Sequence, residues 1–295
     1  MTVLASETVE FESAPPAQQW ASLSFVCCGV RVRVNAPEPI IEKIPANFIP
    51  GSSRDQLGQT DVAFTVSTGE QFEILEDGSS RGIFATWREA LEVLEGSAHE
   101  AIAARATTHA FVHAGVVAFN GKVILIPGRS YAGKTTLVMA LVDAGATYYS
   151  DEYALVDAEG SVHPFVRNPR VRQNFGMNVV INDLIPPPLP VGLVVMTKYK
   201  PNAEWRPKKL SVSQGLFGLI DNSVGIRSYP EMYLGRLKQL AMTAATYSSV
   251  RGDARVAANA ILTELLCNKV TTSAEEKTIE TNSAPRKYFL GESAH

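Results

Sequence analysis

Apolar and polar residues alternate over short stretches in the first third of the chain. Val30, Val32 and Val34 share one face of a predicted strand, and Arg31 and Arg33 lie on the other. The elements expected here are strands at 22–34, 61–66 and 71–75 and a helix at 86–106, capped by Thr86 or a neighbour. This pattern predicts a small α+β domain over residues 21–106, preceded by a poorly ordered N-terminus at 1–20.

From residue 107 the apolar runs become longer and less alternating. A strand at 111–119 meets a strand at 122–127 across Asn120-Gly121, the strongest hairpin signal in the chain. The run at 123–126 is entirely apolar, as expected of a parallel strand that is covered on both faces. The further elements expected are helices at 133–144, 211–221, 233–245 and 255–267 and strands at 146–150 and 191–199, with an irregular, proline-rich stretch at 161–190.

Alternating strands and helices predict an α/β core over residues 107–267, and the polar, aperiodic residues 268–295 predict a tail. The chain has 295 residues, of which 45% are hydrophobic and 19% charged, enough for a sizeable buried core. The formal charge of −3 gives no reason to expect a nucleic acid or an anionic membrane as partner, and no apolar run is long enough to span a membrane.

The cysteines and the N-terminus indicate the cytoplasm. The N-terminus lacks the features of a secretory signal. Cys27 and Cys28 are sequence neighbours that we expect in the core of a strand from Phe25 to Val34, and only Cys267 remains. The odd cysteine count suits no disulfide framework, and the cysteines and histidines are not spaced as metal ligands.

A glycine-bounded segment between the strand at 122–127 and the helix at 133–144 is the main candidate for chemistry. Gly128, Gly133, Lys134 and Thr135 fit the spacing of a phosphate-binding loop, and strand, loop and helix follow in the required order. The nucleotide-binding residues predicted are Gly128, Arg129, Ser130, Tyr131, Ala132, Gly133, Lys134, Thr135 and Thr136. Backbone N–H groups would hold the phosphates, Lys134 would neutralise their charge, and the Thr135 hydroxyl would ligate Mg²⁺.

Two adjacent carboxylates follow the next predicted strand. Asp151 lies where a second acid of a phosphate-loop enzyme belongs, and it could bind Mg²⁺ or accept a proton from an attacking hydroxyl. If the strand persists, Asp151 and Glu152 point to opposite faces, and we expect Asp151 to face the loop. His113 is either a core residue or a hydrogen-bond partner of Asp151 or of the transferred phosphoryl group.

Three arginines, Arg167, Arg170 and Arg172, cluster in the irregular stretch. One of them could stabilise the charge of a migrating phosphoryl group, although a solvated basic loop is the simpler interpretation. Arg129 and Tyr131 lie inside the loop, where they could shape access for the nucleotide.

His113-Ala114-Gly115, the loop at 128–135 and the paired acids at 151–152 together resemble the catalytic core of the HPr kinase/phosphorylase family. The resemblance is close over residues 111–157 and loose over the strand at 191–199. It implies a phosphate-loop kinase core of the phosphoenolpyruvate-carboxykinase type that transfers a phosphoryl group from ATP to a serine. By position, Lys134 and Thr135 resemble the phosphate lysine and the metal hydroxyl, and Asp151 resembles the general base with His113 beside it.

The resulting hypothesis is an ATP- and Mg²⁺-dependent kinase that phosphorylates a serine-type hydroxyl of a peptide or small protein. Its catalytic residues would be Asp151, His113 and Lys134, and its metal site Thr135, Asp151 and Glu152. The chain is similar to divergent HPr-kinase-like proteins, some of which resemble kinases that tailor lasso-type peptides. A kinase of a small hydroxylated metabolite and a non-catalytic ATP-binding switch are the alternatives. Because members of the family assemble through their cores, a homo-oligomer remains open.

Overall fold

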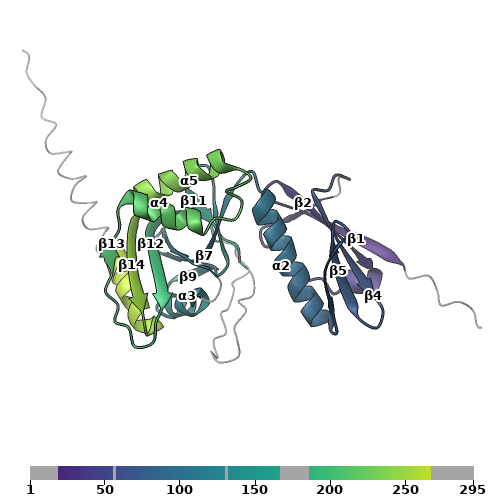
Figure 1. Cartoon of the computed structure of the whole chain (residues 1–295), viewed down its shortest axis with the longest axis horizontal. Coiled ribbons are helices and arrows are strands. Elements are labelled where there is room, and N and C mark those ends of the chain that lie inside the picture. Colours follow the sequence, from purple (N-terminus) through teal and green to yellow (C-terminus); the bar gives the residue numbers. More distant parts are fainter. Residues whose placement is uncertain (1–18, 56–57, 130–131, 167–185, 267–295) are drawn as a thin grey trace, which may run out of the picture. The chain divides into compact units, whose positions relative to one another are not determined.

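The computed structural model describes residues 19–55, 58–129, 132–166 and 186–266 (Figure 1). The chain forms two compact units, one built mainly from residues up to His99 and the other mainly from Glu100 onward. Each contains a β-sheet and at least one helix, so the protein is a mixed α/β protein, as the sequence predicts. Among the described helices, none combines the length and the apolar character needed to cross a membrane.

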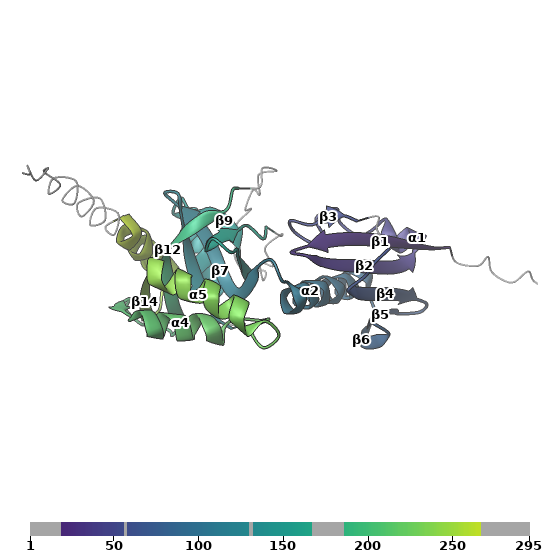
Figure 2. The ribbon, with the colours of Figure 1, turned by 90° about the horizontal axis from the view of Figure 1, so that it is seen from above.

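The first unit is a six-stranded sheet with a long helix along one face (Figure 2). Its elements are β1 (Trp20–Cys27), β2 (Val30–Pro37), α1 (Glu38–Ile41), β3 (Ser53–Arg54), β4 (Val62–Thr68), β5 (Phe72–Glu76), β6 (Ser79–Phe84) and α2 (Trp87–Arg105). The strand order is β3-β1-β2-β4-β5-β6. The helix begins in the expected way, because the Thr86 hydroxyl accepts a hydrogen bond from the Glu89 N–H (3.3 Å) and the Glu89 carboxylate accepts one from the Thr86 N–H (3.2 Å).

The single strand predicted at 22–34 is wrong, because a turn divides it. Cys28 and Gly29 have φ angles of +52° and +82°, a left-handed pair that reverses the chain between β1 and β2. Cys27 is buried at the end of β1, whereas Cys28 is only partly buried in the turn. The alternation of apolar residues continues through both strands, and it therefore concealed the turn.

The second unit holds the predicted loop. Its elements are β7 (Ala110–Phe119), β8 (Lys122–Pro127), α3 (Lys134–Asp143), β9 (Thr147–Ser150), β10 (Tyr153–Val156), β11 (Ser161–His163), β12 (Leu189–Tyr199), β13 (Lys208–Lys209), α4 (Val212–Asp221), α5 (Pro230–Thr243) and β14 (Ala245–Arg251), followed by a helix over residues 254–266. The strand order is β11-β10-β7-β8-β12-β14-β13, with β9 also paired to β7. The hairpin at Asn120-Gly121 forms as predicted, since both residues have positive φ angles (+51° and +72°).

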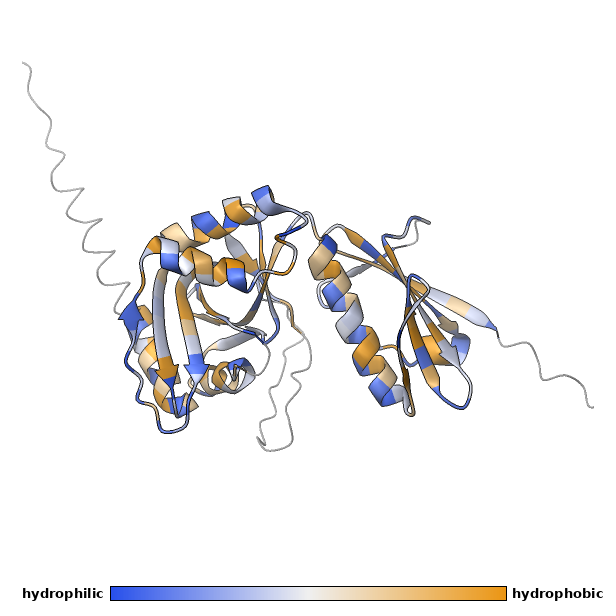
Figure 3. Cartoon of the chain, in the orientation of Figure 1, coloured by the Kyte–Doolittle hydropathy of each residue, from blue (hydrophilic) through white to orange (hydrophobic). Residues whose placement is uncertain are grey.

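Helices cover both faces of this sheet, which explains the wholly apolar run in β8. Val123 and Leu125 pack in one core with α4 and α5. Ile124 and Ile126 pack in a second core with α3 and the helix over 254–266. Figure 3 shows apolar residues concentrated on the strands and interspersed with polar residues along the helices, as expected of helices that each bury one face.

Strand direction brings the loop and the acids to the same edge of the sheet. β8 runs parallel to β12, and β12 runs parallel to β14. Both β8 and β9 pair antiparallel to β7, so β9 runs in the same direction as β8. The residues that follow β8, β9, β12 and β14 therefore gather at one edge, where open α/β sheets bind ligands.

Gly115 on β7 allows α3 to approach the sheet closely. A Cβ at Gly115 would lie 2.5 Å from the Val138 Cγ2 atom of α3. We therefore expect Gly115→Ala to lower the free energy of unfolding by about 1–3 kcal/mol through overpacking. Gly235→Ala in α5, where a Cβ would meet nothing within 4 Å, should instead raise it by about 0.5–1 kcal/mol.

Urea unfolding monitored by circular dichroism measures the free energy of unfolding of both variants and shows whether the two changes have opposite signs. Equal effects of the two substitutions would show that the contact between α3 and β7 is not tight at Gly115.

Candidate functional site

The predicted phosphate loop connects the end of β8 to the start of α3. The Gly128 N–H donates to the His113 carbonyl (3.1 Å), which fixes the start of the loop on β7. Gly133 precedes the helix with a φ angle of +82°, a conformation that favours glycine. Ser130 and Tyr131, two members of the motif, lie outside the described residues. The observed geometry has the strand–loop–helix order that phosphate binding requires.

Lys134 is the first residue of α3, and it is buried with only 8% of its surface exposed. Its Nζ atom donates to the Arg129 carbonyl (3.0 Å) and lies 3.4 Å from the His113 Nε2 atom. Burial lowers the pKa of Lys134 to about 8, against an opposing effect of Asp151 and Glu152. Among the described residues, the ammonium group forms no ion pair with a carboxylate, so an anion that enters the loop can bind it.

Thr135 and Asp151 meet at the edge of the sheet. The Thr135 Oγ1 atom donates to the Asp151 Oδ2 atom (3.1 Å), and the Tyr148 hydroxyl donates to Oδ1 (2.9 Å). Asp151 is 5% exposed. The prediction that Asp151 faces the loop agrees with this contact, whereas the contribution of Tyr148 was not predicted.

We expected Asp151 and Glu152 to point to opposite faces if the strand continued through them. The strand does not continue through these two acids. β9 ends at Ser150 and β10 begins at Tyr153, and Asp151 and Glu152 form the bend between them. The Ser150 hydroxyl accepts hydrogen bonds from the N–H groups of both Glu152 and Tyr153 (3.1 Å each) and stabilises this bend. Both carboxylates consequently act on the pKa of Lys134.

His113 lies beside the loop rather than deep in the core. Its ring is partly buried, with the Nε2 atom directed at Lys134 and its centroid 5.7 Å from that of Tyr153. Its backbone N–H donates to the Asn222 carbonyl (2.7 Å), which connects β7 to the end of α4. The structure thus places the His113 ring next to Lys134 at the start of α3.

Arg129 and the remaining arginines differ in position. The Arg129 side chain is exposed, and its guanidinium lies 3.3 Å from the Asp221 carboxylate at the end of α4. A contact between exposed charges contributes little to stability, so Arg129 is free to exchange Asp221 for another anion. Arg167, Arg170 and Arg172 lie outside the described residues.

Arg251 was not predicted as a site residue. It is the last residue of β14, only 2% exposed, and it donates to the Gly133 carbonyl (2.6 Å). A Cβ at Gly133 would lie 2.5 Å from the Arg251 Nη2 atom, so a larger residue here would have to displace the guanidinium, and the positive φ angle itself favours glycine. The residues of β14 do not alternate clearly between apolar and polar, so their pattern did not predict a strand that would bring Arg251 to the loop.

The oxygen atoms at this edge suit Mg²⁺ that arrives with a phosphate ligand. Among the described residues there is no cluster of three or more histidine, cysteine or acidic side chains that could hold a metal alone. Mg²⁺ usually takes one or two protein carboxylates together with substrate phosphates and water. Thr135 and Asp151, with oxygen atoms 3.1 Å apart, fit that requirement.

Comparison with known proteins gives little further evidence. The chain matches no family model and no curated protein. Among solved structures it is similar to the Hpr(Ser) kinase/phosphatase from Coxiella burnetii, at 13% identity, over 59% of this chain and 99% of that chain, with a TM-score of 0.30. A TM-score this low does not support a conclusion about function.

The buried ammonium of Lys134 predicts an unusual dependence of stability on pH. Its pKa in the folded protein, about 8, lies below the value of 10.5 for a free lysine. Below pH 8 both states carry the proton, and the folded state bears the cost of burying the charge. This cost disappears as the pH rises from 8 to 10.5, because the folded state loses the proton first. We expect Lys134→Met to raise the free energy of unfolding at pH 7 by about 1–2 kcal/mol, after allowance for solvent screening.

Urea unfolding without ligand at pH 7 and at pH 10 checks this. The gain should shrink at pH 10, and Lys134→Arg, which retains the charge, should show no gain. A Lys134→Met protein that is less stable than the wild type at pH 7 would contradict the burial cost.

Proposed function

We propose that the protein is an ATP- and Mg²⁺-dependent kinase that phosphorylates a serine-type hydroxyl of a peptide or small protein. The observation that carries the proposal is the contact between Thr135 and Asp151 (3.1 Å) at the start of a phosphate-loop helix. It places a hydroxyl and a carboxylate suited to Mg²⁺ beside a buried lysine. A glycine-rich turn without a ligand would not require this combination.

The loop and Lys134 would bind the phosphates of the nucleotide. The N-terminus of α3 presents backbone N–H groups and the positive end of the helix dipole. Lys134 would exchange the Arg129 carbonyl for phosphate oxygens and gain the anionic partner that it lacks among the described residues. Binding in this way is stronger than in water because the ammonium group is already desolvated.

Thr135, Asp151 and Glu152 would hold Mg²⁺, with the Thr135 hydroxyl and an Asp151 oxygen as the protein ligands closest to the loop. When bound, the metal ion would neutralise charge on the phosphate oxygens. Glu152 lies in the same bend, where it can bind a water of the metal or hold the acceptor.

Asp151 is proposed as the general base. The acceptor hydroxyl oxygen would form a bond to the γ-phosphorus, the bond from that phosphorus to the ADP oxygen would break, and the hydroxyl proton would move to Asp151. Tyr148 and Thr135 hold the two carboxylate oxygens in fixed positions. His113 lies beside Lys134, where it can contact the transferred phosphoryl group.

The acceptor class rests on the sequence resemblance and not on the structural comparison. A histidine-bearing strand, a phosphate loop and paired acids follow one another in the order found in serine kinases of the HPr kinase/phosphorylase type. The same resemblance suggests the phosphoenolpyruvate-carboxykinase type of core. In the sheet, β7 pairs antiparallel with both β8 and β9, so the histidine-bearing strand adjoins the strand before the loop and the strand before the acids.

Replacing the two acids separately distinguishes their roles. Asp151→Asn should bind ATP but transfer phosphate to a serine-peptide library at least about 10²-fold more slowly, because the base is lost. Glu152→Gln should retain a larger share of the rate. Transfer is measured with γ-labelled ATP under single-turnover conditions, and Glu231→Gln, an exposed acid on α5, is the matched control.

Transfer by Asp151→Asn at the wild-type rate would exclude Asp151 as the base. ATP binding by the wild type without transfer to any peptide or small hydroxylated metabolite would favour a nucleotide-dependent switch. Absence of ATP binding would refute the proposed function.

A further inference from the structure

A large cavity begins at the last residues of the phosphate loop. It has a volume of about 730 Å³ and is lined by one face of α3, by the residues that follow β12 and by those that follow β14. Gly133 of the loop motif and Thr136, another predicted nucleotide-binding residue, both belong to the cavity wall. A ligand whose phosphates occupy the loop can therefore extend directly into this cavity.

The size and the lining of the cavity suit a nucleoside. Ligand pockets commonly measure about 300–1,000 Å³ and combine apolar walls with a few polar groups. Met139, Pro201 and Ala203 give apolar surface, whereas Asn202 and Arg255 give polar groups. The cavity also lies at the carboxyl ends of parallel strands, the usual ligand edge of such sheets.

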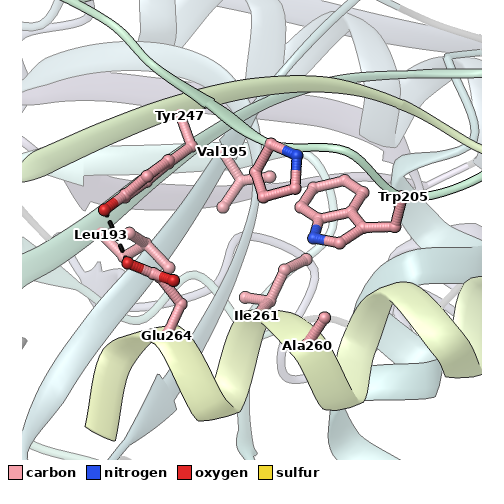
Figure 4. A pocket seen from close by; sticks show the side chains of 8 residues that line it. Leu193, Val195, Trp205, Tyr247, Ala260, Ile261 and Glu264 are labelled. Atoms are coloured by element: carbon pink, nitrogen blue, oxygen red, sulfur yellow. Dashed lines mark hydrogen bonds between the residues drawn. The ribbon is translucent and has the colours of Figure 1, made fainter. Parts of the chain in front are cut away.

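A second pocket, shown in Figure 4, is too small for this role. Its volume is about 110 Å³, and it lies between β12, β14 and the helix over 254–266. Trp205 closes one side, and the Tyr247 hydroxyl donates to the Glu264 carboxylate (2.6 Å) on the other. This pocket has no residue of the phosphate loop in its wall.

Arg251 gives the large cavity a buried positive charge. Beyond its bond to the Gly133 carbonyl, its Nη1 atom donates to the Gly252 carbonyl (3.4 Å), and its guanidinium lies 5.6 Å from the Tyr199 ring centroid. The Nε atom is buried without a hydrogen-bond partner, and Arg251 forms no ion pair within the described part of the chain. Burial lowers the pKa of Arg251, against opposing effects of Tyr199 and Asp253.

Arg251 thus has a buried N–H group without an acceptor, and the described carboxylate that acts on its pKa, Asp253, forms no ion pair with it. An anion in the cavity would satisfy this group. Arg251 adjoins Gly133 at the point where the loop meets the cavity. We propose that this cavity binds the nucleoside of the nucleotide, and that Arg251 binds the phosphate nearest to the sugar. The inference rests on the proposed function, since it assumes that the other phosphates lie in the loop.

Calorimetry with ATP and with inorganic triphosphate separates the cavity from the loop. Wild-type protein should bind ATP at least tenfold more tightly than triphosphate. Ala203→Trp, which places a large side chain in the cavity, should reduce ATP affinity to the level of triphosphate and leave triphosphate binding unchanged. Ala158→Trp, at an exposed position outside the cavity, should change neither affinity.

Arg251→Gln tests the charge. The shorter glutamine loses the bond to the Gly133 carbonyl, but it also removes an unpaired buried charge, so the ligand-free melting temperature should be equal to or above that of the wild type. ATP affinity should fall at least tenfold, and the dependence of this affinity on salt should weaken. A lower melting temperature with unchanged ATP affinity would show a purely structural role for Arg251 and overturn its assignment.

The two levels of the proposal fail in different ways. Equal affinities of the wild type for ATP and triphosphate, with triphosphate binding lost in Lys134→Ala, would overturn the cavity inference and leave the phosphate loop intact. Unchanged ATP binding by Ala203→Trp would overturn the cavity inference as well. Absence of binding for both ligands would refute the proposed function together with the inference.

Discussion

The burial of positive charge at the start of α3 is the constraint on which the candidate site depends. Lys134 enters the helix 8% exposed and contacts a backbone carbonyl and a histidine nitrogen. The close packing of α3 on Gly115 fixes where this ammonium group lies. Asp151 and Glu152 are near enough to act on its pKa, yet neither forms an ion pair with it in the described residues. The Lys134 ammonium and the two carboxylates are thus separate in the ligand-free site. Under the proposed function, phosphate would bind the ammonium and Mg²⁺ would bind the carboxylates.

Much of the second unit was predictable because its signals are local. The apolar run in β8, the Asn120-Gly121 turn and the glycines of the loop each depend on a few neighbouring residues. The turn at Cys28-Gly29 was missed, because the apolar alternation is the same on both sides of it. β6, β11, β13 and β14 were also missed, since short or polar strands are defined by the partners with which they pair.

The residues of the candidate site also fall into those that were predictable from the sequence and those that were not. Lys134, Thr135 and Asp151 were predictable from spacing, and their contacts were found. Tyr148 and Arg251 were not predictable. Tyr148 contacts Asp151 and Arg251 contacts Gly133, and these contacts depend on the fold and not on a sequence motif. The conformation of the acids also required the structure, since the Ser150 hydroxyl bends the chain where an ideal strand would separate the two side chains.

Lys134 follows Gly133 in the chain, and Arg251 donates to the Gly133 carbonyl. Both are buried cations whose described hydrogen-bond acceptors are uncharged. Two buried positive charges without an ion pair destabilise the ligand-free protein. An anion that contacts both would offset the free-energy cost of burying them. Under the proposed function, a phosphate chain that runs from the loop towards the cavity would bring negative charge to both cations. The two cations therefore support the polyphosphate part of the proposed ligand, independently of which hydroxyl the protein phosphorylates.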